Sequence, residues 1–214
     1  MVRHDLAERL QQRVNHARVE LSDAEFECLC NYVQLLWKWN QKTNLTSLDN
    51  SDAGIDRLVV EPLLAARLLP DQLNKIIDLG SGGGSPAIPM KIVVPRMSLL
   101  MVESKQRKAA FLREAVRQLA LEHTHVACIR YEALRLQQDM HEAHEVLLLR
   151  GLRIQEADLK SIGTFIKPGG RLFLFVGARG LADLPRFQGP LTLHKQYPLL
   201  ESLQSQLVVL RKSE

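Results

Sequence analysis

The chain has 214 residues, of which 46% are hydrophobic and 24% charged, the composition of an ordinary globular protein that can bury a core. No apolar run approaches the roughly 20 residues of a membrane span, and Met1 to Arg18 lack the apolar stretch of a signal peptide, so we expect a cytoplasmic protein without a membrane anchor. The net charge of +4 is unevenly distributed along the chain. Residues 1–74 hold 8 Lys and Arg against 11 Asp and Glu, whereas residues 75–214 hold 20 Lys and Arg against 13 Asp and Glu. The basic C-terminal part suits a polyanionic partner.

The first part of the chain, residues 1–74, is expected to form a helical region packed on the rest of the molecule. Ser22 and Glu25 have the spacing of a capping box, which predicts the start of a helix that ends near Asn40. A second helix is expected from Ile55 to Leu69, where a proline follows.

From residue 75 onward, short apolar runs alternate with amphipathic stretches. This alternation predicts a Rossmann-like α/β domain over residues 75–214, with a mostly parallel seven-stranded sheet and helices on both faces. Ligands in such sheets bind at the carboxyl ends of the strands. Strands are expected at 76–79, 98–103, 125–130, 146–150, 171–176 and 207–210, and helices at 86–93, 105–119 and 154–166.

A glycine-rich loop follows the first of these strands. Glycines let a backbone turn sharply and approach a ligand closely. Ser85 stands where the dinucleotide pattern G-x-G-x-x-G has its last glycine, whereas Gly80, Gly82 and Gly84 after the acidic Asp78 give the pattern of S-adenosyl-L-methionine binders. We therefore assign these five residues to cofactor binding, with a nicotinamide-dependent reductase as the alternative enzyme.

Three other strand ends carry candidate residues. Glu103 closes the second strand, where a carboxylate can accept both ribose hydroxyls of an adenosine, in NAD as well as in S-adenosylmethionine. Backbone groups of Glu132 and Ala133, after the third strand, can bond the polar edge of an adenine. Arg150 ends an apolar strand and is expected to project toward the substrate or to pair with a carboxylate on the rim.

Three segments carry a family resemblance. They are WNQKTNLT at 39–46, DLGSGGGSPAIP at 78–89 and KAAFLR at 108–113. In these segments, and over nearly its whole length, the chain resembles the bacterial methyltransferase G family, also called glucose-inhibited division protein B. The resemblance implies a class I methyltransferase that uses S-adenosyl-L-methionine to methylate N7 of a guanosine in small-subunit (16S) rRNA.

The resemblance also implies roles for individual residues. The family's cofactor contacts match Gly80, Ser85, Glu132, Ala133 and Arg150. We expect Asn44 and Arg150 to act beside the reacting base. RNA contacts are expected at Arg57, Lys105, Arg107, Lys108 and Arg130. The implied partner is small-subunit rRNA or the 30S particle, bound by a monomer.

The chemistry of this reaction makes few demands on side chains. Guanine N7 has an in-plane lone pair and carries no proton, so its attack on the sulfonium methyl needs no general base and depends on alignment. The target base must be unpaired or extruded. Arg150 should contact guanine O6 or a phosphate, since a bidentate contact would occupy N7. Arg150→Ala is accordingly expected to lower methylation much more than stability.

No metal ion is expected. His141 and His144 are three residues apart but have no evident third ligand. Cys28, Cys30 and Cys128 form no zinc-like pattern, and we expect them to be reduced thiols.

Five positions depart from the family pattern. Leu58 and Gln206 stand where histidines are usual, Ser85 where a bulky apolar residue is usual, Ala87 where a glycine is usual and Val176 where a lysine is usual. These departures leave open a second function, that of a relative which binds its cofactor or the ribosome without transferring a methyl group.

Overall fold

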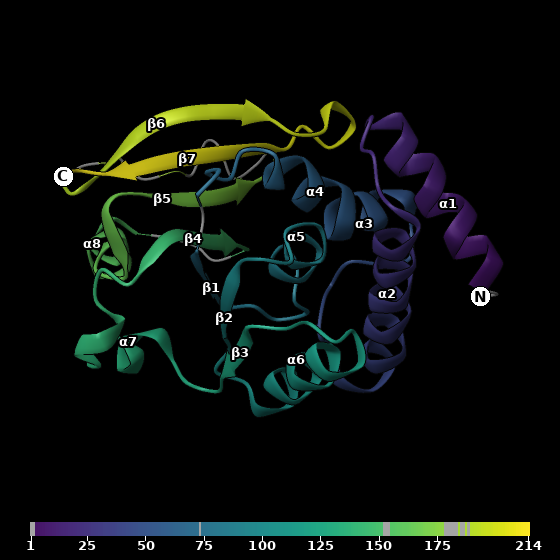
Figure 1. Ribbon diagram of the computed structural model, residues 1–214, viewed down its shortest axis with the longest axis horizontal. Helices are drawn as coiled ribbons and strands as arrows, with labels where there is room; N and C mark the ends of the chain where they lie inside the picture. The colour runs from purple at the N-terminus through teal and green to yellow at the C-terminus, as the bar shows by residue number, and fades with distance from the viewer. Residues whose placement is uncertain (1–2, 73, 152–154, 178–183, 185–186, 188) are drawn as a thin grey trace.

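The protein is described by a computed structural model that covers residues 3–72, 74–151, 155–177, 184, 187 and 189–214. Its centre is a seven-stranded sheet with the order β3-β2-β1-β4-β5-β7-β6, which Figure 1 shows from β6 at the top to β3 at the bottom. The strands β1 to β5 pair in parallel, and β7 is antiparallel to both β5 and β6. The predicted fold is confirmed. The strands are β1 (Lys75–Leu79), β2 (Ser98–Val102), β3 (Thr124–Ala127), β4 (His144–Arg150), β5 (Ile166–Val176), β6 (Leu191–Pro198) and β7 (Gln206–Lys212).

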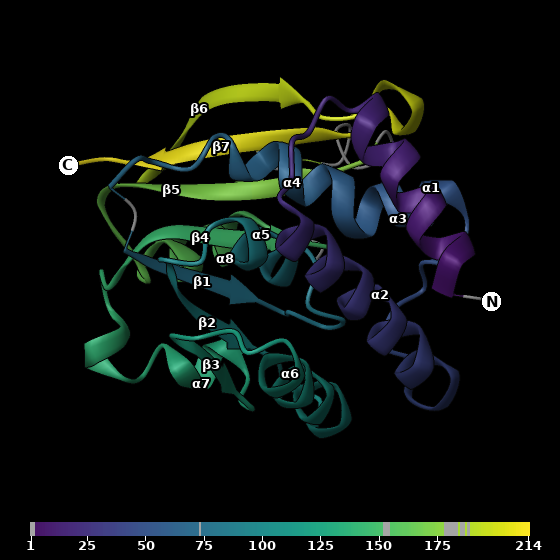
Figure 2. The same ribbon diagram turned by 45° about the vertical axis from the view of Figure 1, so that its right-hand side comes forward.

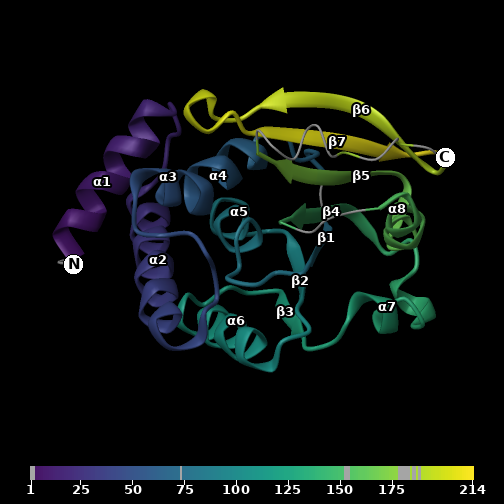
Figure 3. The same cartoon turned by 180° about the vertical axis from the view of Figure 1, so that it is seen from behind.

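Helices cover both faces of the sheet. On one side lie α5 (Ala87–Val93) and α6 (Gln106–Gln118), with α1 (Arg3–His16) and α2 (Asp23–Thr43) packed outside them (Figure 2). The short α7 (Tyr131–Leu134) and α8 (Glu156–Gly163) lie on the other side, as the view from behind also shows (Figure 3). Two single turns complete the chain, η2 (Gln138–Met140) and η3 (Glu201–Leu203). Within the described ranges, no helix is both long enough and apolar enough to span a lipid bilayer.

Alternate side chains of the strands enter two separate cores. Ile76 and Leu148 face the larger core, which includes buried side chains of the N-terminal helices. Ile77 and Leu149 face the smaller core beneath α8. Because successive residues of a strand point to opposite faces, each of these strands is buried on both sides. The N-terminal helical region therefore shares a core with one face of the sheet.

The predicted capping box is present at the start of α2. The Ser22 N–H donates to Glu25 Oε2 at 2.7 Å, and the Glu25 N–H donates to Ser22 Oγ at 3.3 Å. The second predicted helix differs at both ends, because it starts after Ser51, whose hydroxyl accepts the N–H of Gly54, and ends at residue 66. It consists of α3 (Asp52–Ile55), the π-turn η1 (Asp56–Val60) and α4 (Glu61–Ala66).

The strands differ from the prediction at three places. β3 ends at Ala127, three residues earlier than expected. β5 begins at Ile166 rather than at the expected residue 171, and Gly169 within it supplies a left-handed conformation with φ 73°. β6 was not placed from the sequence because most of its side chains are exposed, so an edge strand leaves no alternating pattern. The predicted helix at 154–166 is observed as α8, and its predicted first residue, Ile154, lies outside the described residues.

Candidate functional site

The carboxyl ends of three strands finish level with one another. Leu79, the last residue of β1, pairs with the last residue of β2 and with Leu149 of β4. Gly80 and Glu103, which follow β1 and β2, and Arg150, the last residue of β4, therefore lie side by side at this edge of the sheet. The sheet thus brings together three residue positions that the sequence singled out separately.

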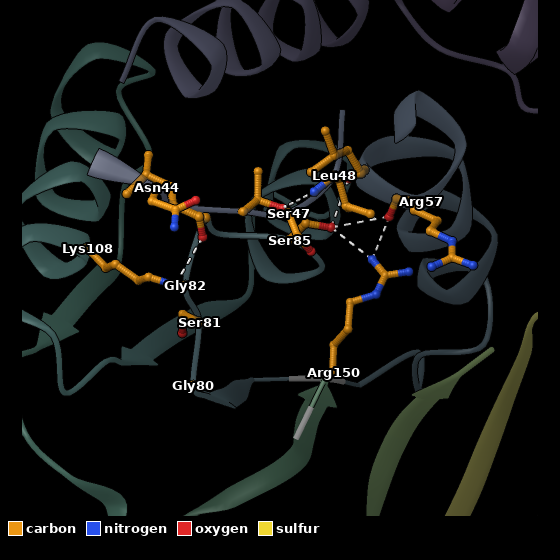
Figure 4. Close-up of a pocket in the computed structure, with 15 residues that line it drawn as sticks. Asn44, Ser47, Leu48, Arg57, Gly80, Ser81, Gly82, Ser85, Lys108 and Arg150 are labelled. Carbon is orange, nitrogen blue, oxygen red and sulfur yellow. Dashed lines mark hydrogen bonds between the residues drawn. The ribbon is translucent and has the colours of Figure 1, made fainter. Parts of the chain in front are cut away.

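A cavity of about 510 Å³ opens above these strand ends (Figure 4). Its volume falls in the range of roughly 300–1,000 Å³ that is usual for small-molecule sites. The glycine-rich loop forms its floor, the segment after α2 forms one wall, and Lys108 and Arg150 stand at opposite sides in Figure 4. The lining residues are Asn44, Leu45, Thr46, Ser47, Leu48, Arg57, Leu58, Gly80, Ser81, Gly82, Gly83, Ser85, Lys108, Arg150 and Gly151.

The glycine-rich loop is held in a conformation that other residues rarely adopt. Gly82 has φ 53° and Gly84 has φ 89°, both in the left-handed region that favours glycine. A Cβ at Gly84 would also lie 2.4 Å from the side chain of Ile88. The fully buried Tyr32 of α2 donates its hydroxyl to Gly83 O at 2.8 Å, which ties the loop to the N-terminal region. The predicted loop is therefore shaped by its glycines and fixed by a tyrosine that the sequence did not single out.

Glu103 holds the loop against the end of β2. Its Oε2 accepts the N–H of Gly82 at 2.9 Å and its Oε1 accepts the N–H of Lys105 at 2.7 Å. The side chain is almost fully buried. Because each carboxylate oxygen can accept more than one hydrogen bond, this carboxylate can also accept from ribose hydroxyls.

Asp78 is a buried carboxyl group with an unused oxygen. The residue is 1% exposed, and its Oδ2 has no hydrogen-bond partner among the described residues. Burial raises the pKa of Asp78 to about 7, the Ser81 hydroxyl opposes this shift, and the negative charge of Glu103 adds to it. Leaving a buried polar atom unpaired is costly, so this atom suits a ligand that brings an N–H donor or a positive charge. A bound ligand with a cationic amino acid moiety would satisfy this oxygen.

Arg150 is engaged with protein groups around the cavity. Its Nη1 donates to Arg57 O at 2.5 Å and to Ser85 Oγ at 3.0 Å, and its Nη2 forms an ion pair with Glu61. The guanidinium also lies over the ring of Phe175, 5.0 Å from its centroid. Burial, and then the nearby charge of Arg57, lower the pKa of Arg150 to about 10, so the group stays charged at neutral pH. Of the two expectations for Arg150, the pairing with a carboxylate is the one observed.

Ser85 connects the loop to the N-terminal region. Its hydroxyl accepts from Arg150 and donates to Leu58 O at 2.9 Å. The side chain therefore lines the cavity but is already bonded to protein groups on both sides. Its small size allows this bridge, which a bulky apolar residue at the same position would not make.

The segment after α2 is fixed by the Trp-Asn motif. Asn40 Nδ2 donates to Thr46 O at 3.1 Å, and the Thr46 N–H donates to Asn40 Oδ1 at 3.0 Å. Asn44 ends α2 in a left-handed conformation with φ 48° and lies exposed at the cavity wall. Lys108 crosses from α6 and donates to Leu45 O at 3.1 Å. The motif had drawn attention to Asn44, whereas Asn40 carries the structural role.

Eight of the predicted site residues do not line the cavity. Three of them, Asp78, Gly84 and Glu103, belong to the loop and the strand ends behind the lining, and the other five lie farther along the chain. Lys105 and Arg107 are exposed at the start of α6, and Arg130 is the exposed residue that precedes α7. Glu132 and Ala133 are exposed on α7. Because β3 ends early, the chain turns into this helix, and these two residues do not line the cavity as the adenine contacts were expected to do.

The histidines and cysteines that the sequence singled out lie in different environments. His144 Nδ1 lies 3.2 Å from Phe165 O, and His141 Nε2 lies 2.6 Å from Arg135 O, so the two rings contact different backbone carbonyls. The three cysteines are free thiols: Cys30 is buried, Cys28 is partly buried and Cys128 is exposed. Burial, with a smaller contribution from Glu27, raises the pKa of Cys28, which makes it less reactive.

Comparison with known proteins assigns the chain to a family. A family model described as rRNA small subunit methyltransferase G matches residues 25–206. The chain belongs to this family. A Paracoccus denitrificans protein named Ribosomal RNA small subunit methyltransferase G is 37% identical over 164 residues, which cover 77% of this chain and 82% of the relative. A protein of the same name from Xylella fastidiosa is 34% identical over 198 residues, covering 91% and 90%.

Solved structures agree on the fold of this methyltransferase G family member. A putative methyltransferase, yhhF, from Escherichia coli superimposes with a TM-score of 0.58 at 13% identity, covering 78% of this chain and 89% of that one. The CurJ carbon methyltransferase gives 0.58 at 14% identity, covering 97% and 71%. The resemblance found in the sequence is thereby confirmed, and membership of a methyltransferase family decides against the reductase alternative.

Proposed function

We propose that the protein transfers a methyl group from S-adenosyl-L-methionine to N7 of a guanosine in small-subunit rRNA. The observation that carries this proposal is the 510 Å³ cavity whose floor is the glycine-rich loop. The buried Asp78 carboxyl, with one oxygen unpartnered, lies behind this loop at the end of β1 and supports it. A family of rRNA methyltransferases provides the reaction class and the acceptor. A degenerate relative that binds without transferring methyl is the competing outcome, and the departures at Leu58, Val176 and Gln206 motivate it.

The described residues fit S-adenosyl-L-methionine. Asp78 would attract the ammonium of its methionine part through its negative charge from behind the loop, and Glu103 would accept from its ribose. Gly80 and Gly82 allow backbone approach along the floor of the cavity. When bound, this cofactor supplies a methyl group on a positively charged sulfur. The protein's own contribution is to orient the donor and to exclude water from the cavity.

No general base is required at the acceptor, because guanine N7 carries no proton. The work of the protein is alignment of the acceptor with the methyl group. Asn44 and Arg150 stand on the cavity wall on either side of the loop, from where they would help to align the donor with the acceptor. Arg150 already contacts Arg57 O, Ser85 and Glu61, so we assign it to shaping the wall rather than to gripping N7.

Basic side chains around the cavity would hold the RNA backbone. Arg57 is exposed at the rim and has no ion-pair partner in the part of the chain that the structure describes. Lys105, Arg107 and Lys108 follow one another at the start of α6, and Arg130 lies beyond the end of β3. We propose that these residues contact phosphates, with residues 1–74 forming one side of the cleft and residues 75–214 holding the cofactor.

Incubation with labelled S-adenosylmethionine and unmodified 30S particles tests the function. We expect label in 7-methylguanosine of the 16S rRNA, and a parallel reaction with naked 16S rRNA shows whether the assembled particle is needed. Label in another nucleotide would overturn the N7 assignment. Intact cofactor binding without any label in either RNA would favour the non-catalytic relative.

Cofactor affinity is expected to rise about tenfold between pH 6 and pH 8. A carboxyl with a pKa of about 7 is roughly nine-tenths protonated at pH 6 and nine-tenths ionised at pH 8. Only the ionised Asp78 attracts the cofactor's ammonium, so binding weakens as the pH falls through this window. Titration calorimetry with S-adenosylhomocysteine at both pH values measures the change. Asp78→Asn should bind weakly with no pH dependence, and equal affinity of the unchanged protein at both pH values would contradict the assignment.

A further inference from the structure

A second, smaller cavity of about 160 Å³ adjoins the first. The two cavities share Arg57, Arg150 and Gly151, so molecules that occupied both would meet at these residues. The far wall of the smaller cavity consists of the end of β5 and the start of β7, where Val176 and Gln206 are paired neighbours. The described lining is Arg57, Glu61, Arg150, Gly151, Phe175, Val176, Gly177 and Gln206.

The two cavities meet at the end of β4, and the smaller one extends from there away from β1 and β2. Glu103 stands at the end of β2, on one side of β1, while the smaller cavity lies at β4, β5 and β7 on the other side. If the ribose binds at Glu103, the methionine end of the cofactor points toward β4. The half occupied by the smaller cavity is therefore left for the molecule that accepts the methyl group.

The walls of the smaller cavity suit a planar base rather than a phosphate. Phe175 and Val176 offer apolar surface for the faces of a ring. Gln206 offers both a donor and an acceptor for its edge. Glu61 is buried, its Oε2 pairs with Arg150, and no described residue makes a hydrogen bond to its Oε1. Glu61 and Arg150 neutralise each other inside this wall, and Arg57 lies at the rim shared with the larger cavity, so a phosphate is attracted to the rim rather than to the interior. The volume matches about five water molecules, which leaves the sugar and phosphate outside near Arg57.

We propose that the smaller cavity holds the base that accepts the methyl group, and that Glu61 and Gln206 read its Watson–Crick edge. This inference rests on the proposed function. Guanine presents N1–H and N2–H donors to a carboxylate, whereas adenine presents the lone pair of N1, which a carboxylate repels. Glu61 and Gln206 are thus specificity-determining residues. The methyl transfer itself takes place at N7, at the end of the base that faces the larger cavity.

Binding of GMP, IMP and AMP to the protein saturated with S-adenosylhomocysteine tests the base site directly. By NMR titration, we expect GMP to bind best, IMP less well because it lacks the N2 amino group, and AMP least. Val176→Phe, which fills the cavity from a half-buried strand end, should weaken GMP binding about tenfold or more, as should Gln206→Ala. Neither variant should change the affinity for S-adenosylhomocysteine by more than about twofold, since neither residue lines the larger cavity.

The matched control is Glu201→Gln, an exposed acid in η3 close to Gln206 in the sequence but outside the cavity. It should leave GMP binding and the KM for 30S particles unchanged, while Val176→Phe and Gln206→Ala raise that KM. Normal GMP binding and normal KM in both cavity variants, with methylation of 30S particles intact, would overturn the base site and leave the proposed function standing. Equal binding of AMP and GMP would overturn the proposal that Glu61 and Gln206 recognise the Watson–Crick edge of the base. Absence of methylation by the unchanged protein would overturn the proposed function. If in that case GMP still bound to the unchanged protein and Val176→Phe abolished this binding, the base site itself would remain supported.

Discussion

Gly82→Val is expected to lower the affinity for S-adenosylmethionine by about a hundredfold or more, the equivalent of roughly 3 kcal/mol of binding free energy. Gly82 has φ 53°, a conformation that strongly disfavours a β-branched residue. A Cβ there would make ordinary contacts of 3.7 Å with Gly80 O and 3.8 Å with Leu45 O, and because Gly82 lines the cavity, a valine side chain would also take up space at the cofactor's approach. Relief of the strain would also pull the Gly82 N–H away from Glu103.

Titration calorimetry with the cofactor measures this effect, and thermal unfolding shows whether the variant is folded. Gly163→Ala is the matched control, because a Cβ at Gly163 makes ordinary contacts of 3.5 Å or more with Leu191 and Pro190, far from the loop. The control should bind the cofactor like the unchanged protein. A folded Gly82→Val protein with normal affinity would show that the glycine-rich loop does not form the cofactor site.

The loop and the sheet were predictable because their signals are local. A buried run, a cluster of glycines and an amphipathic stretch follow one another within about 30 residues, and the acid at the end of the next strand has a fixed place in such a sheet. The capping box at Ser22 was predictable for the same reason, since both partners lie three residues apart. Each of these features is determined by neighbours in the sequence.

The residues that complete the site are fixed by contacts between distant segments. Tyr32 is 51 residues from the carbonyl it bonds, and Glu61 is 89 residues from Arg150 in the sequence. Glu61 does leave one signal, since it is an acid within an otherwise apolar stretch from Leu58 to Leu64. A charge in a segment that must be buried needs a partner, which is how sequence reasoning could have found it.

The third strand shows what local sequence does not determine. The sequence predicts that this strand reaches residue 130, directly before the expected adenine contacts at Glu132 and Ala133. The strand instead ends at Ala127, and residues 131–134 form one helical turn with exposed side chains. Strand ends are set by pairing with the neighbouring strand, and β3 pairs only with β2, which itself ends at Val102. The end of β3 therefore depends on strand pairing in the sheet, and the local sequence does not indicate it.

Arg150→Ala is expected to destabilise the protein by about 3–5 kcal/mol, or roughly 6–20 °C in Tm for a chain of this size. The sequence alone predicted a loss of methylation with little loss of stability. The structure changes this expectation, because the substitution leaves the buried Glu61 carboxylate without its counter-charge and removes the hydrogen bonds to Arg57 O and Ser85. These bonds join the strand end to η1 and to the glycine-rich loop, so activity and stability should fall together.

A double variant separates the buried charge from the rest of the effect. In Glu61→Leu/Arg150→Met both charges are replaced by apolar groups of similar size, which removes the uncompensated carboxylate, so most of the lost Tm should return. Arg117→Ala breaks the exposed ion pair with Glu114 and should leave Tm nearly unchanged. If the double variant melts as low as Arg150→Ala, the loss comes from the hydrogen bonds to the loop and to η1. An Arg150→Ala protein that melts with the unchanged protein would show that Glu61 is not held by this pair.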